Sequence, residues 1–595
     1  MRELRTLLPY VRPYRAAVLW GIVLVVLSNA FGILSPKLLG MAIDALDRPG
    51  VDGRTILVYA LLIVAAALLS GAARYGMREL LNGFSRRVET DVRDDLFRHL
   101  MALDAGFYAR ERTGDLMSRA TNDTSAVRQA AGPAVMYTVN TVALAAFALG
   151  FMLFISPLLT GLALVPLLIL PPLVLHFNRV IHARYQAIQD HFGELSTMVQ
   201  ENLSAARIVR AYVQEVPQER EFDALSREYL KRNMDLARTT GIYRPLLTLL
   251  TGAGMVIVLW LGGLLVMRGR ISVGDFVAFG FYLAMMNWPM IALGWVTNLY
   301  QRGAVAMGRI NRIMRTEPAV RDPARPTLLE EVRGGIEFRA VRFRYPGSER
   351  DVLLDISFRV EPGSTVALVG PTGSGKSTLV ALLARLYDPT AGEVLLDGVP
   401  LPRLSLERIR GALGVVPQEA FLFSETLAAN LALGLDGEEH DVAERVARAT
   451  RIAQLDEAIA GFPHGLLTRI GERGINLSGG QRQRAALARA LARAPRILVL
   501  DDALSAVDSH TERRILEGLR EVLPDRTSLI ISHRVSAVMA ADRILVLDEG
   551  RIVERGTHLE LLEAEGLYAT LLRRQLLEED LDGAAQRLAG ASGGF

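Results

Sequence analysis

Six long apolar stretches in the first half of the chain limit its fold more than any other feature of the sequence. A segment needs roughly 20 predominantly apolar residues to cross the hydrocarbon core of a bilayer as a helix. No comparable stretch follows residue 300, where short Val/Ile/Leu runs alternate with charged helical patterns. We therefore expect a membrane-spanning helical domain over residues 1–315 and a domain built for water after it. The predicted spans lie near residues 17–37, 56–77, 133–155, 158–178, 245–267 and 276–298.

The charged segments between the spans predict the orientation of the membrane domain. Residues 78–132 and 179–244 are too long for turns, and their helical periodicity predicts that the spans continue into water as long helices. Arginines gather in the first of these segments and in residues 2–15, where leucines at helical spacing predict a short helix in the membrane interface. Basic loops favour the cytoplasmic side, so we expect the N-terminus there, although 268-RGR-270 falls on the other side. Six crossings then return the chain to the cytoplasm.

The segments that flank the second domain have no strong period. Residues 316–335 are rich in proline and charge and predict a linker. A domain over residues 336–574 follows. The tail over residues 575–595 predicts either an extra helix that pairs with a partner chain or a frayed terminus.

Composition excludes several classes of site and partner. The 595 residues include no cysteine, which excludes disulfides, thiolate metal sites and cysteine nucleophiles. The formal net charge of +3 gives no support for nucleic-acid binding. Three of the 67 basic residues are lysine, a bias that we interpret as that of a GC-rich bacterial genome. Lys376 is therefore informative, because the chain uses arginine almost everywhere else.

A glycine-rich stretch in the second domain predicts a phosphate-binding loop. A buried strand is expected over 365-TVALVG-370 and a helix over 378-TLVALLARLY-387, and 370-GPTGSGKS-377 between them matches G-x-x-x-x-G-K-[ST]. Glycines let backbone N–H groups approach phosphate closely, and the helix N-terminus adds partial positive charge. We expect Lys376 to reach the β- and γ-phosphates of ATP and Ser377 to bind Mg²⁺. The predicted ATP-binding residues of this loop are Gly370, Thr372, Gly373, Ser374, Gly375, Lys376, Ser377 and Thr378.

A second apolar strand, 497-ILVL-500, is followed by two aspartates. Asp501 stands where nucleotide hydrolases place the aspartate that holds Mg²⁺ through water. An aspartate after a strand is often only a cap, but its position downstream of a phosphate loop favours the metal. Asp502 stands where a glutamate that polarises the attacking water is expected. The aspartate at this position raises the question of whether this site hydrolyses ATP slowly.

The motifs around these two strands resemble those of the ATP-binding cassette (ABC) family. The stretch 477-LSGGQRQR-484 matches the family signature over Leu477, Ser478, Gly479, Gly480 and Gln481. The resemblance covers essentially the whole chain, because six spans with long extensions before one cassette is the layout of an exporter half-transporter. It implies the type I (type IV) ABC exporter fold, a helical membrane domain fused to an α/β P-loop NTPase cassette. Further matches are Tyr345 for the adenine-stacking aromatic, Gln418 for the Q-loop, Glu472 in 468-TRIGERG-474 for the x-loop, Asp508 for the D-loop and His533 for the switch histidine.

The resemblance implies ATP, Mg²⁺ and a second chain. ATP would lie between the phosphate loop of one cassette and the signature of another, so a chain with one cassette needs a partner half-transporter. The implied Mg²⁺ ligands are Ser377, Gln418 and Asp501. The implied catalytic residues are Asp502, Gln418 and His533.

Asp502 departs from the family pattern, which usually has glutamate at this position. Its side chain is one methylene shorter, and a displacement of about 1 Å can cost on the order of 10²-fold in rate. Paired bacterial multidrug exporters are similar, because one of their subunits bears aspartate here. We therefore expect a heterodimer in which this chain's own site is slow and its signature completes the partner's site. Two alternatives stay open: a homodimeric exporter or lipid flippase with Asp502 as a working base, and an ATP-gated channel or regulatory subunit.

Two charged segments resemble the coupling segments of the family. They are 113-TGDLMSRATND-123, with Asp115, and 206-ARIVRAYVQE-215, with Arg210 and Tyr212. We expect each to dock on a cassette, although either could be a plain helical extension.

The spans contain few polar residues that could select a cargo. No charged cluster for one ion or one peptide terminus is apparent in the sequence, and methionine and tryptophan crowd residues 285–295. We expect membrane lipid around the spans and a hydrophobic or amphiphilic cargo (drugs, lipids or hydrophobic peptides) exported across a bacterial cytoplasmic (inner) membrane. Polar candidates for a cavity are Asn29, Asn140, His176, Asn287 and Asn298.

Overall fold

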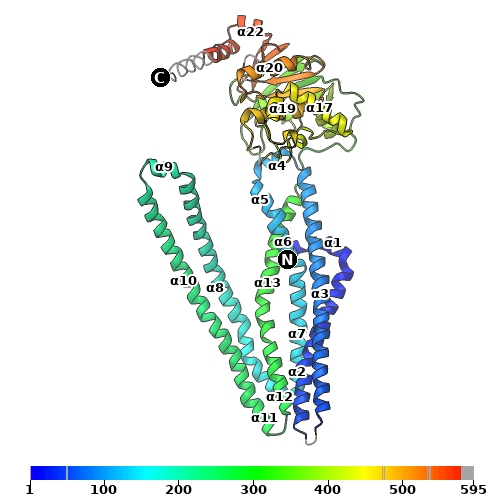
Figure 1. Ribbon diagram of the computed structural model, residues 1–595, viewed down its shortest axis with the longest axis vertical. Helices are drawn as coiled ribbons and strands as arrows, with labels where there is room; N and C mark the ends of the chain where they lie inside the picture. Colours follow the sequence, from blue (N-terminus) through cyan, green and yellow to red (C-terminus); the bar gives the residue numbers. More distant parts are fainter. Residues whose placement is uncertain are drawn as a thin grey trace. The chain divides into compact units, whose positions relative to one another are not determined.

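The computed structural model describes residues 2–48, 51–471, 474, 476–532, 534 and 538–577. The chain forms two compact units (Figure 1). The first consists of Met1–Met101 and Thr113–Thr316, and the second of Ala102–Arg112 and Glu317–Phe595. Glu472, His533 and residues 578–595 of the tail lie outside the described residues.

The first unit confirms the predicted set of six membrane-spanning helices. In the described residues, six helical stretches are long and apolar enough to cross a membrane, and each contains one of the predicted spans. The stretches are Glu3–Leu46, Gly53–Ala102, Thr113–Ile155, Pro157–Ser204, Glu215–Met267 and Val273–Met314. Their elements are η1 (Arg2–Leu7), α1 (Leu8–Val11), η2 (Arg12–Tyr14), α2 (Arg15–Leu46), α3 (Gly53–Ala102), α5 (Thr113–Ser118), η3 (Arg119–Asp123), α6 (Thr124–Ala131), α7 (Pro133–Ile155), α8 (Pro157–Ser204), α9 (Ala206–Ala211), α10 (Glu215–Ile257), η4 (Val258–Gly262), α11 (Gly263–Met267), α12 (Val273–Met285) and α13 (Asn287–Met314).

The helices of this unit extend far beyond their apolar stretches, as their periodicity predicted. Helices α8 and α10 run side by side as an antiparallel pair that α9 joins at one end (Figure 1). Buried His191 of α8 contacts both helices, since its Nε2 lies 2.9 Å from the Leu225 carbonyl oxygen and its Nδ1 lies 2.7 Å from Glu194. Polar contacts therefore join α8 and α10 in addition to the packing of their apolar, membrane-spanning parts.

The sixth span is interrupted at Met286, between α12 and α13. Pro289 falls in the first turn of α13, where a missing N–H removes no intrahelical bond. Before the break, α12 packs closely on α2 because both helices carry glycine at the contact. A Cβ at Gly274 would lie 1.9 Å from the Gly40 carbonyl oxygen.

The second unit contains two sheets whose strands carry the chemistry. A four-stranded antiparallel sheet has the order β2-β1-β4-β5, and a six-stranded sheet has the order β10-β9-β3-β8-β7-β6. In the second sheet the contacts among β9, β3, β8, β7 and β6 are parallel, and β10 is antiparallel. Parallel strands covered on both faces are mainly apolar, which is why β3, β7 and β8 are rich in valine, isoleucine and leucine and almost wholly buried.

The elements of the second unit are α4 (Ala105–Arg110), β1 (Ile336–Phe343), β2 (Leu353–Val360), β3 (Thr365–Val369), α14 (Lys376–Leu383), β4 (Ala391–Leu396), β5 (Val399–Pro400), η5 (Leu401–Arg403), α15 (Leu406–Ala412), β6 (Leu413–Val416), α16 (Leu427–Leu431), α17 (Glu439–Ile452), α18 (Asp456–Ala460), η6 (Gly465–Leu467), α19 (Gly479–Ala492), β7 (Ile497–Asp501), α20 (Ser509–Arg520), β8 (Thr527–Ile531), β9 (Arg543–Asp548), β10 (Arg551–Gly556) and α22 (His558–Glu563).

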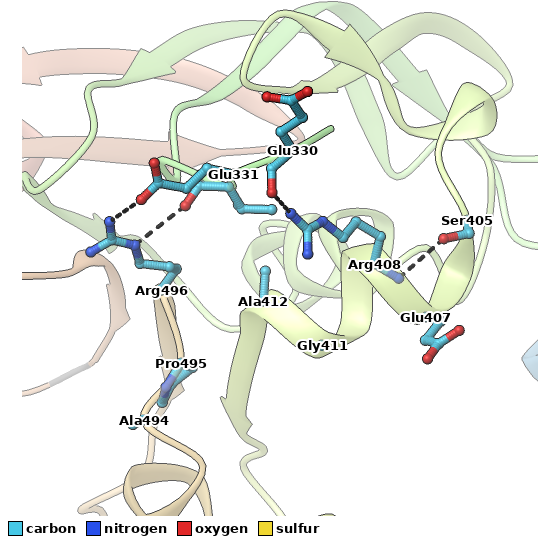
Figure 2. A pocket seen from close by; sticks show the side chains of 11 residues that line it. Glu330, Glu331, Ser405, Glu407, Arg408, Gly411, Ala412, Ala494, Pro495 and Arg496 are labelled. Carbon is cyan, nitrogen blue, oxygen red and sulfur yellow. Dashed lines mark hydrogen bonds and ion pairs between the residues drawn. The ribbon is translucent and has the colours of Figure 1, made fainter. Parts of the chain in front are cut away.

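The proline-rich segment before β1 is bound along the surface of the second unit. Asp397 accepts three backbone N–H bonds from residues 333–335 at 2.7 to 3.2 Å. Arg408 donates to the carbonyl oxygens of residues 329 and 330 at 2.6 and 2.5 Å, and Arg496 pairs with Glu331 at 3.2 Å (Figure 2). A hollow of about 620 Å³ lies beside these contacts. Both arginines that line it are already bonded to the segment, so the hollow offers no free cation to a phosphate.

Candidate nucleotide-binding and hydrolysis site

The predicted nucleotide residues meet because four parallel strands end at one edge of the sheet. Strands β3, β8, β7 and β6 are neighbours in that order, and ligands of such sheets bind beyond the carboxyl ends of the strands. Gly370 follows β3, Asp501 ends β7, and exposed Gln418 lies two residues after β6. With one strand between them, β3 and β7 lie about 10 Å apart, which leaves room for a phosphate chain and a metal ion.

The loop after β3 has a backbone that requires its glycines. Gly370, Gly373 and Gly375 have φ angles of 153°, 84° and 102°, a region that side chains rarely adopt. A Cβ at Gly370 would also lie 2.0 Å from the Leu547 carbonyl oxygen. The sequence pattern therefore produces a tight loop at the start of α14 whose conformation depends on its glycines.

Lys376 is the first residue of α14 and folds back over this loop. Its Nζ donates to the carbonyl oxygens of Gly370 at 2.9 Å and Pro371 at 2.7 Å, and lies 3.3 Å from the Ser374 hydroxyl. The side chain is 6% exposed, and this burial lowers the pKa of the ammonium, whereas the charges of Asp501 and Asp502 raise it. A buried cation held by loop carbonyls fits a site that takes a polyanion. Ser377, the next residue, is exposed beside it and has a hydroxyl suited to Mg²⁺.

Tyr345 is held at the other side of the loop. Its hydroxyl lies 3.0 Å from the hydroxyl of Thr378, and its ring packs edge-on against Tyr387 with centroids 5.4 Å apart. Its position is therefore fixed relative to α14, as a residue that stacks on a base requires.

The segment Ala102–Arg112 packs beside this aromatic pair. A Cβ at Gly106 of α4 would lie 3.4 Å from Pro346 and 3.5 Å from the Tyr387 ring. Asp104 caps α4 by accepting the Phe107 N–H at 3.1 Å, and its second oxygen accepts the Ala319 N–H at 2.6 Å. This early segment thus contacts the cassette next to the residue expected to hold adenine.

Asp501 and Asp502 are both buried, with 7% and 9% of their surface exposed. Asp502 has a φ of 50°, in the left-handed region. Its N–H donates to the Ile531 carbonyl oxygen at 2.8 Å, and its own carbonyl oxygen accepts the Ser505 hydroxyl at 3.0 Å. The backbone of Asp502 is therefore fixed to β8 on one side and to the following turn on the other.

The signature residues form the start of α19. Ser478 is the N-cap: its hydroxyl accepts the Gln481 N–H at 3.2 Å, while the Gln481 side chain accepts the Ser478 N–H at 2.9 Å. Gly480 packs so closely that a Cβ would lie 2.8 Å from the Ala506 carbonyl oxygen, and Leu477 is buried. The reciprocal cap holds the helix N-terminus, with its partial positive charge, in a defined position.

Two residues that the sequence analysis did not select hold the turn before Asp508, and the first of them joins it to the signature helix. Buried Gln483 donates to the Ser505 hydroxyl and accepts the Ala506 N–H, both at 2.8 Å. Arg534 donates to the carbonyl oxygens of Ser505 and Val507, both at 3.0 Å, and pairs with Glu512. A glutamine within an alanine-rich helix was the available signal for the first, because such a residue needs partners if it is buried.

The other predicted positions are placed as follows. Asp508 caps α20 and accepts the Thr511 N–H at 2.9 Å, a bond that lowers the pKa of its carboxyl group. Asp115 lies in α5 of the first unit, Arg210 in α9, and Tyr212 after α9 with 73% of its surface exposed. The predicted coupling segment 113–123 therefore belongs to the first unit, whereas Ala102–Arg112 packs with the second.

Comparison with known proteins agrees with this geometry. The ABC transporter transmembrane region matches residues 18–290, and the ABC transporter domain matches residues 353–505. A probable multidrug resistance ABC transporter ATP-binding/permease protein of Bacillus subtilis, YheI, is 39% identical over 567 residues, which cover 95% of this chain and 96% of that protein. The chain belongs to the ABC transporter family.

Other relatives of this ABC transporter also match along their whole length. The multidrug resistance-like ATP-binding protein MdlA of Escherichia coli is 36% identical and covers 98% of this chain and 99% of that protein. The ATP-dependent lipid A-core flippase of Photobacterium profundum is 34% identical, with 96% and 97% covered. The solved structure of a bacterial Atm1-family ABC exporter with ATP bound has a TM-score of 0.76 and 29% identity, and covers 94% of this chain and 98% of that one.

Family membership settles the general activity. The chain is a multi-pass membrane protein with the ABC exporter fold, and its cassette binds ATP. Hydrolysis of ATP in this family is coupled to transport across the membrane.

Proposed function

We propose that this chain is one subunit of a heterodimeric exporter that moves hydrophobic or amphiphilic compounds out across the bacterial inner membrane. Its partner carries glutamate where this chain has Asp502. The site on this chain's own phosphate loop holds ATP and hydrolyses it slowly. The partner's site, completed by Ser478 to Gln481 of this chain, hydrolyses quickly. The N-terminus and the cassette lie in the cytoplasm.

The geometry of Asp502 supports the slow site. A shorter side chain could act as a full base only if its backbone moved toward the water by about the length of the missing methylene. That backbone is fixed by the N–H bond to Ile531 and by the Ser505 hydroxyl on its carbonyl oxygen. The left-handed φ of 50° further limits its adjustment. The carboxylate is therefore set back from where a glutamate would place it.

The nucleotide residues have separate tasks in this proposal. Lys376 and the loop N–H groups bind the phosphates, Tyr345 orients the base, and Gln418 and Asp502 position water. Mg²⁺, held by Ser377, Gln418 and Asp501 together with phosphate oxygens, would neutralise charge on the transferred group. In this proposal Asp501 would hold the metal and Asp502 would polarise the attacking water.

The intact signature supports the assignment of a working half-site to this chain. Ser478, Gly479 and Gly480 begin a capped helix whose N-terminus suits a γ-phosphate. The phosphate on this chain's own loop is already surrounded by that loop, so the signature serves another cassette. Because the chain has one phosphate loop and one signature, and each ATP needs the loop of one chain and the signature of another, the motifs support a dimer.

Purification of the tagged chain from its own host, with mass spectrometry of what accompanies it, tests the proposal. A second six-span cassette chain with glutamate after its Walker B aspartate is the expected companion. If only homodimers of this chain were recovered, the heterodimer proposal would be wrong. Asp502 would then be a working base in a homodimeric exporter or flippase. ATP-dependent accumulation of cargo in inside-out vesicles separates an exporter from a channel, since a channel would move solute only down its gradient.

A further inference from the structure

The membrane unit contains a cavity that brings together two of the predicted polar candidates, Asn29 and Asn140, with residues that the sequence analysis did not select. It has a volume of about 360 Å³, within the range of small-molecule sites. Its walls come from α2, α3, α7, α12 and α13, helices of one unit. The residues that line it include Asn29, Arg74, Arg78, Tyr137, Asn140 and Trp288.

Arg74 and Arg78 give this cavity two positive charges. They are four residues apart on α3, a spacing that places both on one face of the helix and makes them repel each other. Neither guanidinium bonds to a carboxylate or a carbonyl oxygen within the described part of the chain. By contrast, Arg93 and Arg98 of the same helix pair with Glu89 at 2.9 Å and Asp95 at 2.7 Å.

The two asparagines of the cavity leave it a further donor. Asn29 donates to the Asn140 side-chain oxygen at 3.0 Å and to the Val25 carbonyl oxygen at 2.8 Å. Because that oxygen of Asn140 already accepts a bond, its amide N–H₂ stays available as a donor. No aspartate or glutamate lines the cavity. Two guanidinium groups and an amide without a nearby carboxylate favour an anion.

The rest of the lining is apolar and aromatic. Ile33, Met77, Met136, Leu144 and Met285 line it together with the rings of Tyr137 and Trp288. Met285 and Trp288 flank the break in the sixth span at Met286.

The two arginines lie toward one end of the second apolar stretch, whereas other lining residues lie further inside their spans. Arg74 falls in the last turn of the apolar stretch over 56–77 and Arg78 just beyond it, whereas Ile33 and Leu144 lie deep in their own spans. Lone basic residues at this level could simply reach the lipid headgroups. Two of them in one cavity with aromatic and thioether walls match a ligand with a charged head and an apolar body.

We propose that this cavity selects a cargo with a phosphate, sulfate or carboxylate head joined to an apolar or aromatic body. Arg74, Arg78 and Asn140 bind the head, and the methionines with Tyr137 and Trp288 contact the body. This assignment rests on the proposed export function and narrows its substrate class. The anionic head can belong to a membrane lipid or to a soluble amphiphile.

Three pyrene-labelled probes with one dodecyl body test the choice of head: a sulfate, an uncharged alcohol and a trimethylammonium. The full-length chain, with its co-purified partner, is placed in phosphatidylcholine nanodiscs, and binding is followed by energy transfer from tryptophan to pyrene. The sulfate is expected to bind about tenfold more tightly than the trimethylammonium probe, because charge-assisted hydrogen bonds are among the strong polar contacts. Its affinity should fall as salt is added, while that of the alcohol stays constant.

Variants then assign the preference to the two arginines. Arg74→Gln with Arg78→Gln should weaken the sulfate about tenfold and leave the alcohol within about twofold, whereas Arg74→Lys with Arg78→Lys should keep the preference. Arg86→Gln is the matched control, since Arg86 is exposed on α3 and outside the cavity lining. Equal affinity for the three heads in the unaltered protein, or equal losses in the Arg86 control, would overturn the assignment. The salt and head-group comparisons need no variant, so they decide the matter even if the double glutamine variant does not fold.

Two further experiments test whether the anionic head belongs to a lipid or to a soluble amphiphile, and whether binding is followed by export. Phosphatidic acid in the nanodiscs should displace the sulfate probe if a lipid is the cargo, and should leave it bound if a soluble amphiphile is. In inside-out vesicles, failure to accumulate any probe with ATP while the binding preference persists would count against export and leave the cavity assignment standing. Accumulation of all three probes at one rate, unaffected by the glutamine variants, would support export and overturn the cavity assignment.

Discussion

At the scale of single residues, the proposed heterodimer makes Asp502 the residue that limits hydrolysis at this chain's own site. A glutamate there would advance the carboxylate by one methylene without moving the fixed backbone. We expect Asp502→Glu to raise hydrolysis at this site on the order of 10- to 100-fold. The measurement is the ATPase rate of a pair whose partner has its own glutamate replaced by glutamine, so that this site alone is read. If Asp502→Asn abolished a rate that Asp502→Glu failed to raise, Asp502 would be a competent base.

Lys376 lowers the stability of the chain without nucleotide, because its ammonium is buried, and is expected to contribute to the binding of ATP. Burial lowers its pKa, so the folded chain disfavours the ammonium relative to the unfolded chain. That cost is fully present below the folded pKa and disappears as the pH rises past the ordinary value of 10.5. We expect Lys376→Met to melt no lower than the unaltered chain near neutral pH without nucleotide, and to gain no stability from Mg-ATP.

Thermal melts with and without Mg-ATP measure both effects of Lys376. Lys231→Met is the control, because Lys231 is largely exposed and lies 3.8 Å from Glu228. It should melt as the unaltered chain does and retain the ATP-induced rise. An equal rise in Lys376→Met would show that the loop binds phosphate without the ammonium.

At the scale of elements, Gln483 couples the signature helix to the turn that leads to Asp508. Gln483→Met keeps the volume but leaves the Ala506 N–H without its acceptor, a loss of about 1–3 kcal/mol for a buried donor. We expect a lower melting temperature and slower hydrolysis at the partner's site, with ATP affinity on this chain's loop retained. Gln483→Glu keeps the acceptor and loses the donor to Ser505, so its effect should be smaller. An identical loss in both variants would contradict the role of the Ala506 contact.

Elements with local patterns could be predicted from the sequence, and contacts between distant elements could not. The six spans, the strand before Gly370 and the loop of Gly370 to Ser377 each depend on neighbouring residues, and the structure has helices, strand and loop at those places. Asn29 and Asn140 were predicted as cavity candidates, but the part of Arg74 and Arg78 in that cavity escaped prediction because it needs five helices to be placed at once. From the sequence, Arg78 appeared only as a basic flank that indicates orientation. Gln483 and Arg534 likewise matter only because the turn at Ser505 lies between them.

At the scale of the whole molecule, Asp104 binds two stretches that lie far apart in the chain. Its carboxylate caps α4 and accepts the Ala319 N–H. We expect Asp104→Ala to lose the cap, at about 1 kcal/mol, and to reduce the stimulation of ATPase by cargo more than the basal rate. Asp104→Asn can still cap α4, so its stability and its stimulation by cargo should lie between those of the unaltered chain and those of Asp104→Ala. Full stimulation in Asp104→Ala would show that α4 transmits nothing.

The membership of Ala102–Arg112 in the second unit also has a consequence for biosynthesis. This segment leaves the ribosome about 200 residues before Glu317, the point at which the rest of its unit begins. At roughly 5–20 residues per second, the interval is on the order of ten to forty seconds. Throughout that time α4 has no Tyr387 or Pro346 to pack against. The cassette therefore completes its folding against a segment that was synthesised before it. A cassette synthesised alone from Glu317 would lack the contacts that Ala102–Arg112 makes with it.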